Sequence, residues 1–284
     1  MLLAIDRSAG SWEATRLATH LAPKLKAPVT VLSVLVPGTP RKEATDQSRR
    51  EYEVVRELVD DIVKELVVAN VKANGEVRSS KRSEVAREIL GSATRLGADL
   101  ILMGSRARGE LTGLLLGSVS YTVAMSALCP VVIVPAGAMA KLMPRRIVLV
   151  INGEGDPERP VGATLELARA LKATVEVVCV GRTFGDAVGT EESSTSQNPD
   201  EQAVAEAVAT LKTAGLEVTS RMIDNRRGLT PEIAREVIST GADMIVLGTR
   251  TLGWEGGDVA AGAAEAVLHR TRRPVVVAPT RRRR

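Results

Sequence analysis

The sequence GADLILMGSRARGELTGLLLGSVS, residues 97–120, indicates the fold most clearly because it joins a strand, a glycine-rich turn and a helix. Within it, DLILM is a continuous apolar run, which is typical of a strand buried on both faces of a parallel sheet. The turn begins at Gly104 and ends at Gly117, where a helical pattern starts. A strand that leads through glycines to a helix N-terminus is a common binding site for phosphate groups.

The stretch has a second copy, so the chain contains a duplicated domain. RLGADLILMGSR at residues 95–106 returns as STGADMIVLGTR at residues 239–250. A repeat this long is a whole domain rather than one unit of a solenoid. The 284 residues therefore predict two domains, 1–136 and 145–280, joined by a basic linker of small residues.

Apolar β-branched runs alternate with helical patterns in both copies, which predicts three-layer α/β domains. In the first copy we expect helices at 10–25, 47–69, 82–96 and 117–128, between strands at 2–6, 28–35, 71–78, 99–104 and 130–134. In the second copy we expect a helix that opens at Thr230 and strands at 146–152, 174–181, 216–223, 243–248 and 274–278. The polar stretches 37–49 and 189–202 are expected to be loops.

Composition argues against two kinds of partner. One Phe, two Trp and two Tyr are too few for the stacking platforms that single-stranded nucleic acid needs. The formal net charge of +4 is supplied by the four arginines at 281–284, so we expect no basic stripe for a phosphate backbone. The longest apolar stretch, near 129–140, contains two prolines and is too short to span a bilayer. We therefore expect neither nucleic acid nor a membrane as a partner.

Cysteine usage and the lack of catalytic patterns predict a cytoplasmic protein that is not an enzyme. Cys129 and Cys179 lie in apolar runs without CxxC spacing, and charged residues interrupt the opening apolar run too early for a signal peptide. His20 and His269 fall in helical patterns away from the glycine turns. Because no Ser-His-Asp, Cys-His or metal-ligand pattern is present, we predict no catalytic residue and no metal-binding side chain.

Two strand ends in the first copy have the chemistry of a nucleotide site. In open α/β sheets, ligands collect at the carboxyl ends of strands where the strand order reverses. The first strand ends at Asp6, whose carboxylate can accept a hydrogen bond from a ribose hydroxyl or an adenine amine. The fourth strand ends at Gly104, followed by the cation of Arg106, and Gly117 and Ser118 begin a helix with free amides. The alternative that the glycines only close tight turns stays open.

Two widespread nucleotide motifs are missing from this region. No GxGxxG follows the first strand, and GSRARGEL carries Glu110 where a P-loop has its lysine. The sequence therefore disfavours a dehydrogenase of the Rossmann type and a Walker ATPase.

A more specific resemblance covers nearly all of each repeat. Residues 97–120, together with CPVVIVP at 129–135, resemble the C-terminal signature of the universal stress protein family, and LLAIDRSAGS at 2–11 resembles its first strand. The family signature is Gly, two residues, Gly, nine residues, Gly, then Ser or Thr. It maps here onto Gly104, Ala107, Gly117 and Ser118. An alanine thus replaces the second glycine, and this replacement is expected to lower the affinity for a ligand by about tenfold.

The resemblance implies a Rossmann-like, HUP-type fold: two tandem open parallel sheets of five strands, in the order 3-2-1-4-5, with helices on both faces. It also implies ATP as the ligand, with Mg²⁺ or Mn²⁺ bridging the phosphates. The residues implied to frame the adenosine are Ala4, Asp6, Val34 and Met103. Those expected to hold the phosphates are Gly104, Arg106, Ala107, Gly117, Ser118, Val119 and Ser120.

The second copy has lost part of this set. Asn152 replaces Asp6, Ala263 replaces the signature serine, and Glu255 and Asp258 bring negative charge to the loop. We therefore predict that only the first domain binds ATP. The second domain is expected to act as an intramolecular pseudo-dimer partner, because family members commonly pair through the fifth strand, and a homodimer is a further expectation. The alternative is a scaffold that binds no nucleotide in either half.

Overall fold

The computed structural model describes residues 1–37, 46–105, 117–138, 143–151, 157–181, 199–224, 235, 237–248, 267 and 270–279. The chain divides into two compact units. The first comprises Met1–Met143 and Arg272–Pro274, and the second comprises Pro144–Thr271 and Val275–Arg284.

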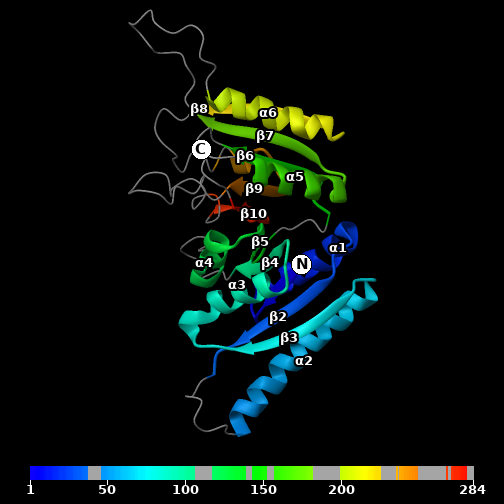
Figure 1. The fold of residues 1–284 in the computed structure, drawn as a ribbon, viewed down its shortest axis with the longest axis vertical. Coiled ribbons are helices and arrows are strands. Elements are labelled where there is room, and N and C mark those ends of the chain that lie inside the picture. The colour runs from blue at the N-terminus through cyan, green and yellow to red at the C-terminus, as the bar shows by residue number, and fades with distance from the viewer. Residues whose placement is uncertain are drawn as a thin grey trace, which may run out of the picture. The chain divides into compact units, whose positions relative to one another are not determined.

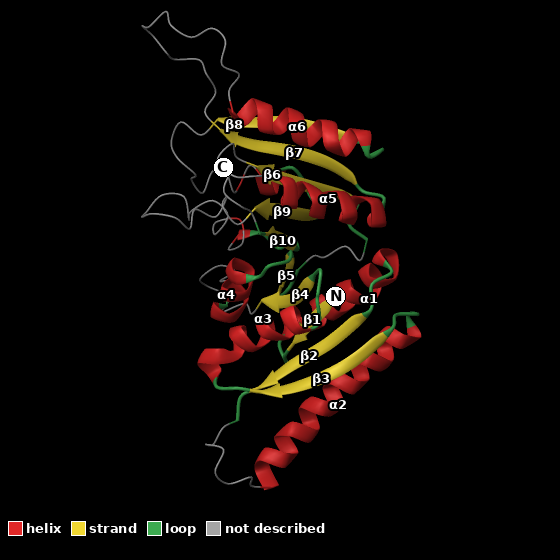
Figure 2. Ribbon diagram, in the orientation of Figure 1, coloured by secondary structure: helices red, strands yellow, loops and turns green. Residues whose placement is uncertain are grey.

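The first unit is built on a parallel sheet of five strands, visible as arrows in Figures 1 and 2. The strands are β1 (Leu2–Ile5), β2 (Val29–Leu35), β3 (Ala73–Ser79), β4 (Ile101–Ser105) and β5 (Val131–Pro135). Their order is β3-β2-β1-β4-β5, and every described pairing is parallel. The predicted α/β fold class and the strand order 3-2-1-4-5 are therefore confirmed.

Four α-helices and one short 3₁₀ helix connect these strands. They are α1 (Ala9–Leu25), α2 (Asp46–Val68), η1 (Arg82–Glu84), α3 (Val85–Arg95) and α4 (Ser118–Ser126). The chain moves from β1 to β3 in one direction along the sheet and then from β3 to β5 in the other. Because crossovers between parallel strands are right-handed, α1 and α2 cover one face and α3 and α4 cover the other.

The core of the first unit consists of aliphatic side chains, as the near absence of aromatic residues requires. Leu2, Leu3, Ile101 and Leu102 are completely buried, and β5 is buried along its whole length. The continuous apolar runs thus lie between two helical layers. They exclude water on both faces of the sheet and supply most of the favourable free energy of folding.

The second unit repeats this arrangement. Its strands are β6 (Arg146–Ile151), β7 (Thr174–Gly181), β8 (Val218–Asp224), β9 (Met244–Gly248) and β10 (Val275–Ala278), in the order β10-β9-β6-β7-β8. Its described helices are α5 (Glu158–Leu171) and α6 (Pro199–Thr213). Counted from its own first strand, the order is again 3-2-1-4-5. The opening of the helix predicted at Thr230 lies outside the described residues, and residues 235 and 237–239, which follow it, are helical.

Two predicted loops are shorter than expected. The helix α2 begins at Asp46, within one residue of the predicted helix at 47–69, and α6 begins at Pro199. The last residues of the stretches 37–49 and 189–202 are therefore helical. Polarity misled the prediction, because the first turn of a helix favours such residues. A carboxylate such as that of Asp46 interacts favourably with the positive end of the helix dipole, and proline is accepted at the first helical position.

Candidate functional site

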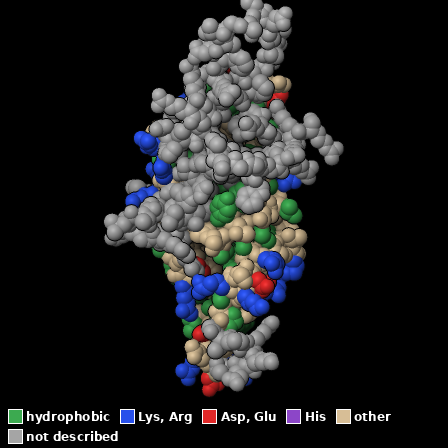
Figure 3. Space-filling view, turned by 90° about the vertical axis from the view of Figure 1, so that its left-hand side faces the viewer, with side chains coloured by type: hydrophobic (Ala, Val, Ile, Leu, Met, Phe, Trp, Pro, Cys, Tyr) green, Lys and Arg blue, Asp and Glu red, His purple; other side chains and the backbone are tan. Residues whose placement is uncertain are grey.

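The order of the strands reverses between β1 and β4, which are direct neighbours. The arrowheads of β2 and β3 point to the left in Figure 1, and Figure 3 shows the molecule from that side. Several Lys and Arg side chains lie on the described part of this face. Among the exposed cations, Arg7 follows β1, and Lys81 and Arg82 follow β3. Positive charge is thus available at the edge where the sequence predicts an anionic ligand.

Hydrogen bonds with Ser8 and Ser11 hold Asp6 at the end of β1. Its Oδ1 accepts from the backbone N–H of Ser8 at 2.9 Å and from the hydroxyl of Ser11 at 2.7 Å. The Ser11 Oγ in turn accepts from the backbone N–H of Asp6 at 2.8 Å. Ser8 also caps α1, because its hydroxyl accepts from the N–H of Ser11. The half-buried carboxylate therefore has a fixed position at the carboxyl end of β1, where the strand order reverses.

The first turn of α1 packs directly on the end of β4. A Cβ atom on Gly104 would lie closer than 3.0 Å to backbone atoms of Gly10 and Ser11, and a Cβ on Gly10 would collide with the carbonyl oxygen of Ser105. Glycine is therefore required at both positions so that two backbones can meet. The signature residue Gly104 thus has a packing role that is independent of any ligand.

Gly117 differs from Gly104 in this respect. It precedes α4 with φ of −66° and ψ of 150°, which any residue can adopt. A Cβ on Gly117 would meet only the Ser120 Oγ, at an ordinary distance of 3.6 Å. Neither the backbone conformation nor packing among the described residues requires glycine here. A glycine at a helix N-terminus without such a requirement fits the close approach of a ligand to the main chain.

The first turn of α4 presents main-chain donors. The N–H groups of Ser118, Val119 and Ser120 have no acceptor within the helix, because the first intrahelical bond at this end runs from the Tyr121 N–H to the Gly117 carbonyl at 2.9 Å. The N-cap residue is Gly117, so no capping side chain accepts hydrogen bonds from these N–H groups. The Ser118 side chain is exposed, whereas the buried Ser120 hydroxyl donates to the Gly117 carbonyl at 3.0 Å. Ser120 can therefore offer only its amide to an anion.

The residues predicted to frame an adenosine lie at neighbouring strand ends. Ala4 on β1 is in register with Met103 on β4, and both side chains are buried. Val34 on β2 is half-buried and in register with Arg78 on β3. The structure thus brings Ala4, Asp6, Met103 and Gly104 together at the switch point. Arg106 and Ala107 lie outside the described residues.

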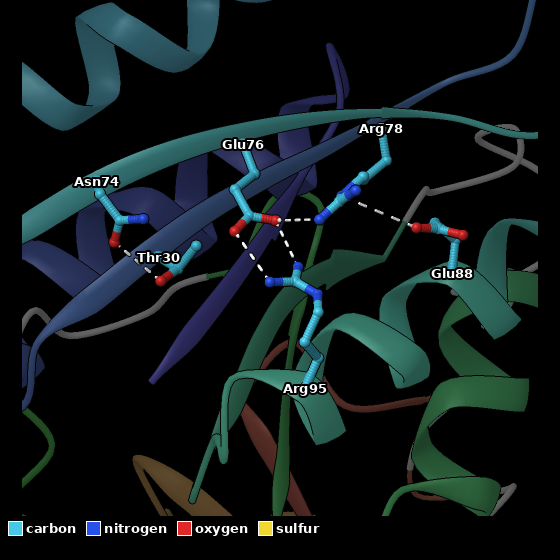
Figure 4. Close-up of polar contacts among 6 residues, drawn as sticks. All are labelled: Thr30, Asn74, Glu76, Arg78, Glu88 and Arg95. Carbon is cyan, nitrogen blue, oxygen red and sulfur yellow. Dashed lines mark hydrogen bonds and ion pairs between the residues drawn. The ribbon is translucent and has the colours of Figure 1, made fainter.

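The ion-pair network drawn in Figure 4 fixes Arg78, which is the register partner of Val34. Both guanidinium Nη atoms of Arg95 donate to the Glu76 carboxylate, at 3.3 and 2.6 Å, and Arg78 Nη2 adds a third hydrogen bond at 3.3 Å. These hydrogen bonds, with that from Arg95 the strongest, hold the pKa of Glu76 below its ordinary value. Arg78 Nε also lies 4.0 Å from a carboxylate oxygen of Glu88. The network fastens α3 to β3.

Gly10 and Ser11 are the site residues that sequence reasoning missed. The motif SAGS at residues 8–11 carries both, and its two serines three residues apart predict a helix N-cap. Nothing local in that motif shows that Ser11 bonds to Asp6, or that Gly10 meets β4.

The side chains most often used in catalysis lie elsewhere. His20 is half-buried on α1, with Nδ1 2.9 Å from the carbonyl oxygen of Arg16. Cys129 precedes β5 and so lies at the opposite edge of the sheet, where burial raises the pKa of its thiol. His269 lies outside the described residues. Within the described ranges, no group of three His, Cys, Asp or Glu side chains could hold a metal ion, and no helix has the length and apolar character to cross a membrane.

Among the described residues of the second unit, no side chain caps α5 as Ser8 caps α1. The helices α1 and α5 both end at a left-handed lysine, Lys26 and Lys172, with φ of 52°. Aligned on these residues, Ser11 corresponds to Pro157, which precedes α5 without a side-chain cap. Asn152 and the loop after β9 lie outside the described residues.

An open parallel sheet of order 3-2-1-4-5, present twice and bearing a glycine turn at the reversal of the first copy, defines a tandem Rossmann-like α/β protein. The model of the family described as "Universal stress protein family" matches residues 1–135 and 143–279. The chain therefore belongs to the universal stress protein family as a tandem member, which confirms the predicted resemblance.

Relatives of known sequence and structure agree with this membership. The universal stress protein YxiE of Bacillus subtilis is 32% identical over 146 residues, which span 47% of this chain and 97% of that protein. The universal stress protein Rv2623 of Mycobacterium tuberculosis is 25% identical over 289 residues, 98% of this chain and 95% of that protein. In fold, the chain resembles a universal stress protein from Archaeoglobus fulgidus DSM 4304, with a TM-score of 0.72, 19% identity and coverage of 99% and 96%.

Proposed function

We propose that this tandem universal stress protein is an ATP-binding regulatory protein of the stress response, and that its first domain alone binds the nucleotide. The observation that carries the proposal is Gly117. Its missing side chain is required neither by its backbone nor by its described neighbours, and it opens a helix whose first amides have no helical acceptor. Such amides at the positive end of a helix dipole favour a phosphate group.

The residues present fit ATP and a divalent ion. The amides of Ser118, Val119 and Ser120 supply donors for the phosphates, and Arg106 adds a cation. Asp6 and Val34 lie at the adjacent ends of β1 and β2, where the adenosine would extend. Mg²⁺ or Mn²⁺ bound together with the nucleotide would neutralise part of the phosphate charge.

We further propose that the nucleotide is an effector and not a substrate. His20 bonds to its own helix, and Cys129 lies at the opposite edge of the sheet with a raised thiol pKa. Neither group can serve as a base or nucleophile for a ligand at the carboxyl ends of β1 and β4. Binding would instead order the turn that follows β4 and change the surface offered to a partner.

The second domain completes the proposal as an internal partner. Asn152 and Ala263 stand where the first copy has Asp6 and Ser118, and Pro157 stands where it has Ser11. A copy without these polar groups is suited to pairing rather than to binding ATP. A cytoplasmic location and a homodimer complete the proposed picture.

The second candidate is a scaffold that binds no nucleotide, and Ala107 favours it. A side chain at this signature position costs on the order of 1–2 kcal/mol if the backbone there is left-handed, and it takes space near the phosphates. That cost corresponds to about tenfold in affinity, which weakens binding without abolishing it.

Titration of the full chain with ATP decides between the two candidates. The purified protein is first denatured and the supernatant assayed for released nucleotide, and calorimetry then follows ATP binding with Mg²⁺ or Mn²⁺. We expect saturable binding that Gly117→Asp weakens by at least tenfold, because a carboxylate would face the phosphates. The matched control is Gly91→Asp, which adds the same charge at an exposed position of α3 with open space around it, and which should change affinity less than twofold. No binding at millimolar ATP would leave the scaffold as the function, and steady phosphate release would make the protein an enzyme.

A further inference from the structure

The hydrogen bonds between β1 and α1 point to a residue outside the family signature. We propose that Ser11 is a positioning residue of the nucleotide site: its hydroxyl holds the Asp6 carboxylate where that carboxylate accepts a hydrogen bond from a ribose hydroxyl. The inference rests on the proposed function and assigns recognition of the ribose to Asp6 and Ser11.

Ser11 acts on Asp6 in both directions. It donates to Oδ1 at 2.7 Å and accepts from the Asp6 N–H at 2.8 Å, so the side chain and the backbone of Asp6 are fixed together. An O–H donor to a carboxylate at this distance forms one of the stronger hydrogen bonds in proteins. The Ser8 N–H is the second donor to the same oxygen, at 2.9 Å. One oxygen therefore receives two hydrogen bonds from the turn.

Ser11 is itself held firmly. Its exposed fraction is 5%, and the preceding residue, Gly10, packs on the backbone of β4 without room for a Cβ. The hydroxyl therefore cannot follow Asp6 if that side chain rotates, and the side chain is held to one orientation. Preorganised polar groups of this kind cost little entropy when a ligand binds.

The position of Asp6 along the sheet edge selects the ribose. Val34 lies at the end of β2, Asp6 at the end of β1, and Gly104 at the end of β4, so they follow one another in the order of the strands. Neighbouring strands lie about 4.8 Å apart, which is close to the spacing of base, sugar and phosphate in a nucleotide. With the phosphates at α4 beyond β4, the middle position faces the sugar. Because an ionised carboxylate only accepts hydrogen bonds, the ligand must supply the hydroxyl proton.

The second copy of the domain supports a shared purpose for the two residues. There, Asn152 replaces Asp6 and Pro157, which has no donor, replaces Ser11. The carboxylate and the hydroxyl that holds it have thus been lost together.

The test compares ATP with 2′-deoxy-ATP and 3′-deoxy-ATP on the full chain by calorimetry. We expect wild-type protein to bind at least one deoxy analogue about tenfold more weakly than ATP, because the site loses a hydrogen bond to a charged group. In Ser11→Ala, ATP affinity should fall about tenfold while affinity for that analogue stays within twofold, so the discrimination disappears. Ser11→Thr, which keeps the hydroxyl, should restore discrimination to within threefold of wild type.

The matched control is Thr15→Val. Thr15 is as buried as Ser11 and lies one turn further along α1, but its hydroxyl donates to the Ser11 carbonyl at 2.9 Å and not to Asp6. Removing it should cost stability and leave the ratio of ATP to deoxy-ATP affinity unchanged. Should Ser11→Ala not fold, Ser11→Cys keeps the volume, weakens the donor and should reduce the same ratio.

The outcomes separate the two proposals. Wild-type protein that binds ATP and both deoxy analogues equally overturns the role of Ser11 and leaves the proposed function in place. A Ser11→Ala variant that loses affinity equally for all three ligands, or for none, also overturns it. Absence of saturable ATP binding by wild-type protein refutes the proposed function and this inference with it.

Discussion

The close contact between α1 and β4 makes Gly104→Ala the most informative perturbation of the first domain. The new Cβ would lie closer than 3.0 Å to the carbonyl carbon and oxygen of Gly10 and to the nitrogen of Ser11. Over-packing of a core costs typically about 1–3 kcal/mol. All three atoms belong to the backbone and cannot rotate away, so we expect the upper end, about 3 kcal/mol. For a domain of this size, such a loss lowers the unfolding temperature by roughly 10 °C.

Urea unfolding of the full chain measures this loss of stability. Trp12 on α1 is half exposed and reports on the first domain once Trp254, in the second half of the chain, is replaced by phenylalanine. Two glycines serve as controls. Gly91 lies in a helix with open space around it, so Gly91→Ala should raise the free energy of unfolding by up to about 1 kcal/mol. The free energy of unfolding of Gly117→Ala should stay within about 0.5 kcal/mol of the wild-type value. A Gly104→Ala protein as stable as wild type would refute the reasoning, because the two backbones would then have room to separate.

Two further predictions concern stability. Lys26 ends α1 in a left-handed conformation with φ of 52°, so Lys26→Gly should stabilise the first domain by about 1 kcal/mol in urea unfolding. Lys172→Gly should stabilise the second domain by the same amount. A loss of stability in either variant would contradict the expectation that a left-handed backbone favours glycine. Glu76→Gln should lower stability by about 1 kcal/mol at pH 7. Arg95 holds the folded-state pKa of Glu76 below its unfolded value. The difference in unfolding free energy between wild type and Glu76→Gln should therefore be complete above the unfolded pKa and shrink as pH falls through the folded pKa. A difference that is constant with pH would rule out the ion pair as its source.

Much of the fold could be predicted from the amino-acid sequence because the pattern of apolar residues is local. Runs such as DLILM at 99–103 predicted buried strands, and β4 begins and ends within two residues of the predicted 99–104. The boundary that failed, at Pro199, is a place where the residues of a loop and those of a helix's first turn are alike. The strand order came from the family resemblance rather than from the pattern.

The candidate site was predictable only in part. Asp6, Gly104 and Gly117 stood out because a carboxylate and glycines follow strands that α/β topology brings to one edge. Ser11 did not, because a serine in the first turn of a helix has an ordinary explanation as part of its cap. Its bonds to Asp6 depend on how sharply the chain turns between β1 and α1.

By itself, the sequence determined that the chain is a duplicated α/β protein with aliphatic cores and a glycine turn in each half, since composition, repetition and hydrophobic period are written along the chain. The tertiary structure decided what each glycine is for. Gly104 has no side chain because α1 lies against it, while Gly117 has none although nothing described around it takes the space. Glycine serves both purposes, and only the distance between segments that are remote in the chain distinguishes the two roles.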